Sequence, residues 1–212
     1  MINEVFRHRS RPERPAPGKR NWVRIIGGGW RGRRVQFPDS PGLRPTPDRV
    51  RETLFNWLQH SIAGTRCLDL FAGSGALGIE ALSRGAREVV FVEQARDPAL
   101  TLSAELERLG GSSRATVIET AAQRFLAAPG EPFDGIFLDP PYGRGHLADC
   151  VAAIEAGGWV KAGGWVYLEG ERAAGVPAIP AHWDLVKSKS AGEVGYHLAR
   201  IGVPRIRARA GE

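Results

Sequence analysis

Short apolar runs alternate with longer segments of helical spacing along most of this sequence, from Arg66 to Glu169. The short runs predict buried strands, whereas apolar residues that recur three and four positions apart predict helices. A chain that alternates strand and helix forms a mostly parallel sheet with helices on both faces. The sequence therefore predicts an α/β, doubly wound fold. Two further strands, 183–189 and 194–201, flank an Ala191-Gly192 turn and predict a closing antiparallel hairpin.

Charge is distributed unevenly along the 212 residues. Residues 1–51 contain 13 Lys or Arg against 4 Asp or Glu, a net charge of +9, whereas residues 52–212 contain 16 against 19, a net charge of −3. A basic segment beside a nearly neutral domain is typical of a protein that binds a polyanion. A solvated tail is the simpler explanation, but the aromatic and glycine residues interleaved after Asn21 favour a binding surface.

Composition divides the chain into four segments. Residues 1–20 are predicted to be a disordered basic arm, because arginine and proline dominate and little there can form a core. Residues 21–45 are predicted to be a basic β-hairpin extension, 46–203 the main domain and 204–212 a basic tail. Thr46 is predicted to be the N-cap of the helix that follows the hairpin.

Several features exclude other classes of protein. No apolar run approaches the length of a membrane span, and the N-terminus lacks the apolar core of a secretory signal, so we expect a cytoplasmic protein. The two cysteines, Cys67 and Cys150, fit neither a disulfide framework nor a metal site. We therefore expect no bound metal, no membrane contact and no obligate protein partner.

The segment 133–143 ends a predicted strand with Asp139-Pro140-Pro141-Tyr142. Proline has no backbone N–H and a fixed φ, so the strand stops in a stiff turn at its carboxyl end, where ligands bind in open α/β sheets. The Asp139 carboxylate and the Pro140 carbonyl can each accept one N–H of a nucleobase amine, which aims the amine's lone pair at an electrophile. Tyr142 can stack on the base. A rigid turn without chemistry is the alternative.

A glycine-rich turn joins the first strand of the main domain to a helix. Asp69 ends that strand, and the turn contains Phe71, Ala72, Gly73, Ser74 and Gly75. Such a turn lets a ligand approach the backbone at a helix N-terminus. The next strand ends at Glu93, where an acidic side chain can accept both hydroxyls of a ribose. Gly78, three residues after Gly75, leaves an NAD-type dinucleotide site open as an alternative.

The Asp-Leu-Phe-Ala-Gly-Ser-Gly turn at 69–75 and the Asp-Pro-Pro-Tyr turn at 139–142 together resemble class I S-adenosylmethionine-dependent methyltransferases. The resemblance implies a Rossmann-like, seven-stranded, mostly parallel sheet with an antiparallel C-terminal hairpin, and S-adenosyl-L-methionine as the cofactor. It also implies that Asp69 and the turn lie beside the methionine part and that Glu93 binds the ribose. Ala121 stands where the family carries a polar residue for adenine, which is a departure from its pattern, so adenine would need the backbone, Gln123 or Thr120; Ala121 and Ala122 are the predicted cofactor-binding residues there.

A second resemblance lies before and at the start of the main domain. The segments Gly27-Gly-Gly-Trp-Arg-Gly, Arg44-Pro-Thr and Asp48-Arg-Val-Arg-Glu are similar to the N-terminal motifs of RsmD-type methyltransferases. The likeness runs from about Arg24 to Ile201. It implies methylation of the exocyclic N2 amine of a guanine in small-subunit (16S) ribosomal RNA, as naked RNA or in the assembling subunit. Cationic side chains suit phosphate contacts; the predicted RNA-binding residues are Arg24, Trp30, Arg31, Arg33, Arg34, Arg49 and Arg51.

Two other functions are compatible with the sequence. A DNA adenine-N6 methyltransferase uses the same tetrapeptide, although this chain has no obvious large target-recognition domain. The other is a nucleic-acid-binding module with a vestigial methyltransferase site, against which the intact Asp139, Tyr142 and Glu93 argue. Cofactor affinity and the identity of the methylated nucleoside would separate the three.

Overall fold

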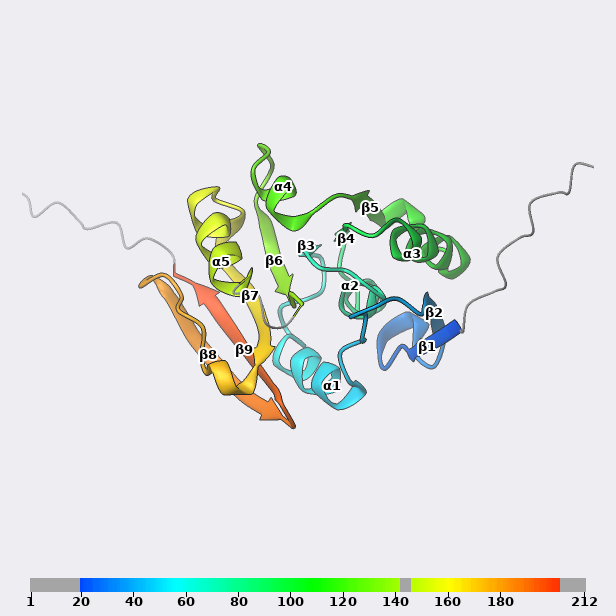
Figure 1. The fold of residues 1–212 in the computed structure, drawn as a ribbon, viewed down its shortest axis with the longest axis horizontal. Helices are drawn as coiled ribbons and strands as arrows, with labels where there is room; N and C mark the ends of the chain where they lie inside the picture. Colours follow the sequence, from blue (N-terminus) through cyan, green and yellow to red (C-terminus); the bar gives the residue numbers. More distant parts are fainter. Residues whose placement is uncertain (1–19, 142–145, 203–212) are drawn as a thin grey trace, which may run out of the picture.

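Seven strands form one sheet at the centre of the protein (Figure 1). The structure is a computed structural model, and it describes residues 20–141 and 146–202. Strands β3 to β7 are parallel to one another, and β9 pairs antiparallel with both β7 and β8. Across the sheet the order is β5 (Ala115–Glu119), β4 (Glu88–Glu93), β3 (Arg66–Asp69), β6 (Phe133–Leu138), β7 (Val160–Glu171), β9 (Val194–Ile201) and β8 (Trp183–Ala191). The predicted sheet and its antiparallel hairpin are confirmed.

Successive side chains of these strands point to opposite faces, so the sheet has a hydrophobic core on each side. One core contains Phe91, Phe137 and Tyr167 and the apolar faces of three helices, namely α1 (Asp48–Trp57), α2 (Ala76–Ser83) and α3 (Arg96–Leu109). The other core contains Ile136 and Leu168 and is covered by α4 (Ala122–Leu126) and α5 (His146–Ala156) (Figure 1). No helix in the described ranges is long and apolar enough to cross a membrane.

An N-terminal hairpin packs against α2 and α3. Its strands β1 (Arg20–Arg24) and β2 (Arg34–Pro38) are antiparallel, and the short 3-10 helix η1 (Gly28–Trp30) lies between them. An isolated two-stranded hairpin is marginal in water, so docking on the main domain stabilises it. The inward side chains of the hairpin are buried in the same core as α2 and α3: Val23, Ile25, Val35 and Phe37.

A buried acidic side chain, Glu80 in α2, fastens this hairpin to the domain. Its carboxylate is fully buried and accepts the backbone N–H groups of Ile26 at 2.8 Å and Gly27 at 2.7 Å. Arg84 Nε donates to the same carboxylate at 2.7 Å, and Arg51 Nη1 lies 3.6 Å from it. Two guanidinium groups and two amides therefore compensate one buried anion, as a buried charge requires.

The structure corrects two predictions at the start of α1. Arg51 is only 1% exposed; its Nη2 donates to the Arg24 carbonyl at 2.9 Å and the Asp48 carboxylate at 2.6 Å, and its Nε donates to the Thr46 carbonyl at 3.0 Å. A guanidinium enclosed in this way cannot reach a phosphate, so the prediction that Arg51 binds RNA is wrong. The predicted N-cap is also wrong, because Pro47 takes that position without a side-chain hydrogen bond.

Candidate active site at the carboxyl edge of the sheet

Four acidic side chains lie at the carboxyl ends of four adjacent parallel strands. Asp69 ends β3, Glu93 ends β4, and Asp139 follows the last residue of β6. The register of β6 and β7 places Glu169, near the end of β7, beside Asp139. Ligands of open α/β sheets bind at this edge. The fold therefore gathers residues from distant parts of the sequence into one candidate site.

The glycine-rich turn after β3 adopts a backbone conformation that favours glycine. Gly73 and Gly75 have φ angles of +51° and +74°, in the left-handed region. A side chain at Gly75 would also overlap Leu102 of α3. Backbone conformation and packing are therefore sufficient to explain why position 75 is a glycine. Helix α2 begins directly after it.

Glu93 holds this turn in place from the neighbouring strand. Its Oε2 accepts the Gly73 N–H at 2.8 Å, and its Oε1 accepts the Ala95 N–H at 2.7 Å. A carboxylate offers about four lone-pair sites, so about two remain for other donors. Glu93 is partly exposed, which leaves those sites open to a ligand at the edge. The vicinal hydroxyls of a ribose match this acceptor.

Asp69 is more enclosed than the other residues of the turn. It is 3% exposed, and its Oδ2 accepts the N–H of Gly78 in the first turn of α2 at 2.9 Å. Burial raises the pKa of Asp69 to about 7; the hydrogen bond from Gly78 lowers this pKa, and the nearby charges of Asp139 and Glu93 raise it further. Asp69 thus supports the α2 N-terminus, and contact with a methionine moiety stays a prediction.

The other residues predicted to bind cofactor lie at the same edge. Phe71 is half-buried, whereas Ala72 and Ser74 are buried within the turn. Ala121 occupies the N-cap position of α4, two residues after the end of β5, without a side-chain cap, and Ala122 is the buried first residue of that helix. Neither alanine has a polar side-chain atom for adenine, so their role in cofactor binding also stays a prediction.

Asp139 is held by a residue that sequence reasoning placed elsewhere. The Thr46 hydroxyl, in the loop before α1, donates to Asp139 Oδ2 at 3.3 Å across 93 positions of sequence. Thr46 is 5% exposed and Asp139 is half-buried. Burial raises the pKa of Asp139 to about 6, and the hydrogen bond from Thr46 lowers that pKa. The Arg44-Pro-Thr motif therefore orients the carboxylate of the proline turn.

Glu169 and Tyr167 form a second polar pair next to Asp139. Glu169 is 2% exposed, and its Oε2 accepts the Tyr167 hydroxyl at 2.6 Å. Burial raises the pKa of Glu169 to about 8, and the charge of Asp139 raises it further, whereas hydrogen bonds from Tyr167 and Thr46 lower it. Sequence analysis missed Glu169, although it ends an apolar run at the same sheet edge as Asp139 and could have been found by that rule.

The prolines of the turn differ in exposure. Pro140 is buried and Pro141 is exposed. The Pro140 carbonyl remains the predicted second acceptor for a substrate amine. Tyr142, predicted to stack on the base, lies outside the described residues.

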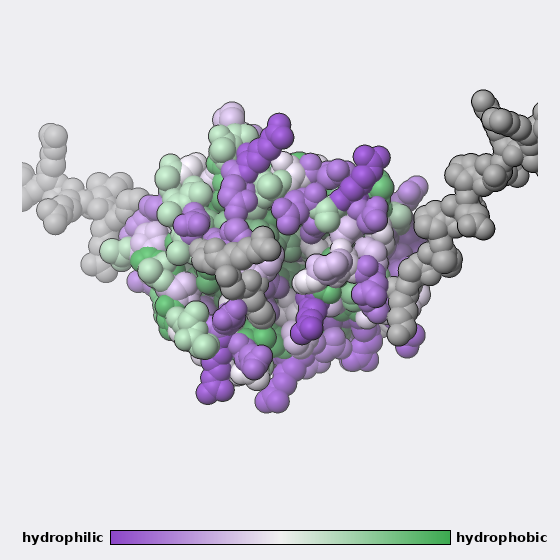
Figure 2. Space-filling view, in the orientation of Figure 1, coloured by the Kyte–Doolittle hydropathy of each residue, from purple (hydrophilic) through white to green (hydrophobic). Residues whose placement is uncertain are grey.

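Most of the arginines predicted to bind RNA are on the surface. Arg24, Arg31, Arg34 and Arg49 are exposed. Arg33 is also exposed, but its guanidinium donates to the carbonyls of the last residues of α3, at 3.0 and 3.3 Å. In Figure 2, hydrophilic side chains cover the region of the hairpin and of α1 on the face shown. Arg51, as described above, is excluded from this surface by burial.

The two tryptophans of the hairpin have opposite environments. Trp30 is half-buried against the hydrophobic core, with the Arg114 guanidinium 5.4 Å from the ring centroid, so its indole contributes to docking of the hairpin. Contact between the exposed part of Trp30 and RNA stays a prediction. Trp22, which sequence analysis did not select, is 53% exposed on the outward face of β1, where it pairs across the hairpin with Gln36.

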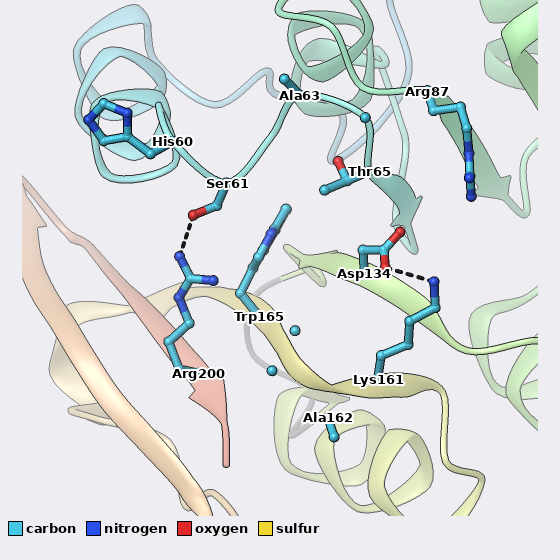
Figure 3. A pocket seen from close by; sticks show the side chains of 13 residues that line it. His60, Ser61, Ala63, Thr65, Arg87, Asp134, Lys161, Ala162, Trp165 and Arg200 are labelled. Atoms are coloured by element: carbon cyan, nitrogen blue, oxygen red, sulfur yellow. Dashed lines mark hydrogen bonds and ion pairs between the residues drawn. The ribbon is translucent and has the colours of Figure 1, made fainter. Parts of the chain in front are cut away.

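A cavity of about 530 Å³ lies at the opposite, amino-terminal edge of the sheet (Figure 3). There Lys161 Nζ lies 2.7 Å from Asp134 Oδ1, and the Arg200 guanidinium donates to Ser61. None of the four acidic residues of the carboxyl edge lines this cavity, so it is separate from the candidate active site. Within residues 20–141 and 146–202, no cluster of His, Cys, Asp and Glu is able to hold a metal ion.

The strand order and the carboxyl-edge site define the class of protein. The structure of SMU.776, described as a putative methyltransferase complexed with SAH, superposes with a TM-score of 0.63 at 15% identity, over 79% of this chain and 54% of that one. A putative RNA methyltransferase from Pyrococcus horikoshii superposes with a TM-score of 0.60 at 17% identity, over 80% and 93%. At these identities the likeness establishes the fold, which is the Rossmann-like fold of class I methyltransferases.

More similar proteins identify the family. The family model "Conserved hypothetical protein 95" matches residues 23–200. The ribosomal RNA small subunit methyltransferase D of Escherichia coli (strain K12) is 48% identical over 83% of this chain and 88% of its own length, and that of Haemophilus influenzae is 44% identical over 86% and 95%. The structure of a putative methyltransferase, yhhF, from Escherichia coli has a TM-score of 0.81 at 44% identity, over 86% and 99%. This chain belongs to that family, the RsmD family of methyltransferases.

Proposed function

We propose that this protein transfers a methyl group from S-adenosyl-L-methionine to the exocyclic N2 amine of a guanine in small-subunit ribosomal RNA. The position of Asp139 carries the proposal: Thr46 holds this half-buried carboxylate at the edge where Glu93 and the glycine turn offer a nucleoside site. The relatives called ribosomal RNA small subunit methyltransferase D support ribosomal RNA as the substrate class.

The carboxyl edge has the donors and acceptors that such a cofactor requires. Glu93 retains lone pairs for both ribose hydroxyls, and the turn 71–75 lies between it and Asp69. Ala121 has no polar side-chain atom, so adenine depends on the backbone around it. When bound, S-adenosylmethionine supplies a methyl carbon on a sulfonium, which a nitrogen lone pair attacks.

The residues of the proline turn then prepare the nitrogen. The Asp139 carboxylate and the Pro140 carbonyl each accept one N–H of the guanine amine and turn its lone pair toward the methyl carbon. The bound cofactor would supply the methyl group and keep the electron pair of its broken C–S bond, and Asp139 would accept the proton that the methylated amine loses and release it to solvent. Orientation of this kind can contribute on the order of 7–11 kcal/mol to the rate.

The hairpin and the start of α1 are the proposed RNA surface. Arg24 and Arg34 are opposite each other on the outward face of β1 and β2, next to the exposed Trp22, and Arg31 and Arg49 extend the positive charge. Arginines bind phosphates without regard to sequence, and an exposed indole can stack on an unpaired base. Thus the surface positions the RNA, and the carboxyl edge selects the amine.

A methyl-transfer assay tests the proposal. Tritiated cofactor would be incubated with unmodified small ribosomal subunits, the stripped RNA or duplex DNA, with Asp139→Ala as the negative control, followed by nucleoside analysis. We expect label in N2-methylguanosine from one of the two RNA substrates. Label in N6-methyladenine of DNA would overturn the substrate assignment, and bound cofactor without transfer to any substrate would favour a binding module.

A further inference from the structure

Two acidic side chains share one hydroxyl at the candidate active site. The register of β6 and β7 places Asp139 beside Glu169, and the loop before α1 brings the Thr46 hydroxyl to both carboxyl groups. The Tyr167 hydroxyl donates to Glu169 from within the sheet. A hydroxyl has one proton to give, so Thr46 can serve only one carboxylate as a donor at a time.

In the described part of the chain, the groups next to this pair are acidic or neutral. Asp69 on β3 interacts with Asp139 and with Glu93 on β4, and Tyr167 and Tyr196 lie on the β7 and β9 side. Among the residues that the structure describes, no Lys, Arg or His forms an ion pair with Asp139 or Glu169. Two adjacent buried anions without a cation are costly, so the pair favours a state with one proton.

Burial and hydrogen bonding indicate where that proton resides. Thr46 donates to Asp139, which stabilises the ionised form of that carboxylate, whereas Glu169 is 2% exposed and loses more hydration on ionising than the half-buried Asp139. Protonated Glu169 still accepts from Tyr167. We infer that Glu169 holds the proton of the pair and is therefore a positioning residue that keeps the Asp139 carboxylate ionised, while Thr46 aims that carboxylate at the substrate amine. This inference rests on the function proposed above.

The pKa directions agree with this geometry. Burial raises the pKa of both groups, to about 8 for Glu169 and about 6 for Asp139. Between these values the pair holds one proton, which stays on Glu169. Below pH 6 Asp139 is also protonated and can no longer accept the amine N–H. Above pH 8 Glu169 ionises and competes with Asp139 for the Thr46 hydroxyl, so transfer slows on both sides.

The pH dependence of kcat in matched variants tests the inference. The wild type should give a bell-shaped profile with limbs near pH 6 and pH 8. Glu169→Gln imitates the protonated acid, so kcat at pH 7 should fall by only about threefold and the alkaline limb should disappear. Glu169→Ala should lower kcat by about tenfold or more at unchanged cofactor affinity. Glu171→Gln, an exposed position on the same strand, is the control and should match the wild type.

A second readout does not depend on activity. The wild-type minus Glu169→Gln difference spectrum at pH 7 should contain the infrared carbonyl stretch of one protonated buried carboxyl group, because Asp69 contributes equally to both proteins. An alkaline limb that persists in folded Glu169→Gln, or a difference spectrum without that carboxyl band, would overturn the inference. A wild type that binds cofactor but methylates no RNA at any pH would instead refute the proposed function, and the infrared comparison would still decide where the proton resides.

Discussion

Glu80 and Glu169 are both buried glutamates, but their neighbours differ. Glu80 is surrounded by the Arg51 and Arg84 guanidinium groups and by two backbone amides of the hairpin. Glu169 has a tyrosine hydroxyl, a threonine hydroxyl and another carboxyl group. The first arrangement fixes a charge and joins two parts of the fold. The second has no described cation to fix a charge, so the carboxyl group can hold a proton. Partners therefore distinguish a structural from a functional acidic residue where burial does not.

The largest effect is expected on kcat, from substitution of Asp139 beside Glu169. Asp139→Ala removes the acceptor for the amine and should lower kcat by about 10³-fold, within the range for a positioned proton acceptor. Cofactor affinity should stay within about threefold of the wild type, since Glu93 and the glycine turn are unchanged. Single-turnover methyl transfer and equilibrium cofactor binding measure the two quantities. A loss of cofactor binding would show that Asp139 is a cofactor ligand.

Substitutions around Glu80 should change the stability of the protein. Arg51→Met leaves Glu80 with one fewer cation and should lower the free energy of unfolding by about 3–5 kcal/mol, as when one partner of a buried ion pair is removed. Urea denaturation measures the loss. In the double variant Arg51→Met/Glu80→Gln the buried charge is gone, and part of the stability should return. Equal stability of Arg51→Met and wild type would mean that Arg84 and the two hairpin amides compensate the Glu80 carboxylate without Arg51.

Thr46 lies between the two regions, and its hydroxyl can be removed with little change in shape. Thr46→Val should lower kcat by about tenfold, the value of one buried hydrogen bond, whereas Thr46→Ser should retain most of the activity. Both are to be measured at saturating cofactor. If serine and valine variants lose activity equally, packing of the threonine methyl group, and not its hydroxyl, supports Asp139.

The acidic residues of the carboxyl edge should also make stability depend on pH. The pKa values of Asp69, Asp139 and Glu169 are raised in the native state, so the native protein keeps protons that the unfolded chain releases near pH 4. Their stabilising contribution is therefore complete below pH 4 and is lost as the pH rises to about 8. Thermal unfolding should show a Tm that falls from pH 5 to pH 9, with a shallower decline in Glu169→Gln. A parallel decline in both proteins would exclude Glu169 as a source.

The smallest effect is expected on the RNA surface. Arg34→Ala should weaken RNA binding and lower the slope of log Kd against log salt by about one, the loss of one phosphate contact. Lys189→Ala, on the edge strand β8, is exposed and should leave the slope unchanged. Equal slopes in the wild type, Arg34→Ala and Lys189→Ala would mean that the RNA does not bind at Arg34.

Local pattern sufficed for the sheet and for Glu93 and Asp139, because both acidic residues end strands and parallel strands share one edge. The contact between Thr46 and Asp139 could not be predicted, because the loop before α1 reaches the turn only after the whole sheet has formed. Arg51 was misassigned for a related reason. Its charge is typical of a surface residue that binds phosphate, while its burial depends on how the hairpin docks.

The guanidinium of Arg51 bridges the hairpin carbonyl of Arg24 and the loop carbonyl of Thr46, whose own side chain holds Asp139. These links make a rigid spacer between the proposed phosphate-binding surface and the carboxylate that receives the amine. On the proposed function, this spacer fixes the distance between the bound phosphates and Asp139. The guanine that reaches Asp139 is then the one that the folded RNA holds at that distance from its bound phosphates. Target choice therefore depends on the shape of the RNA more than on its base sequence.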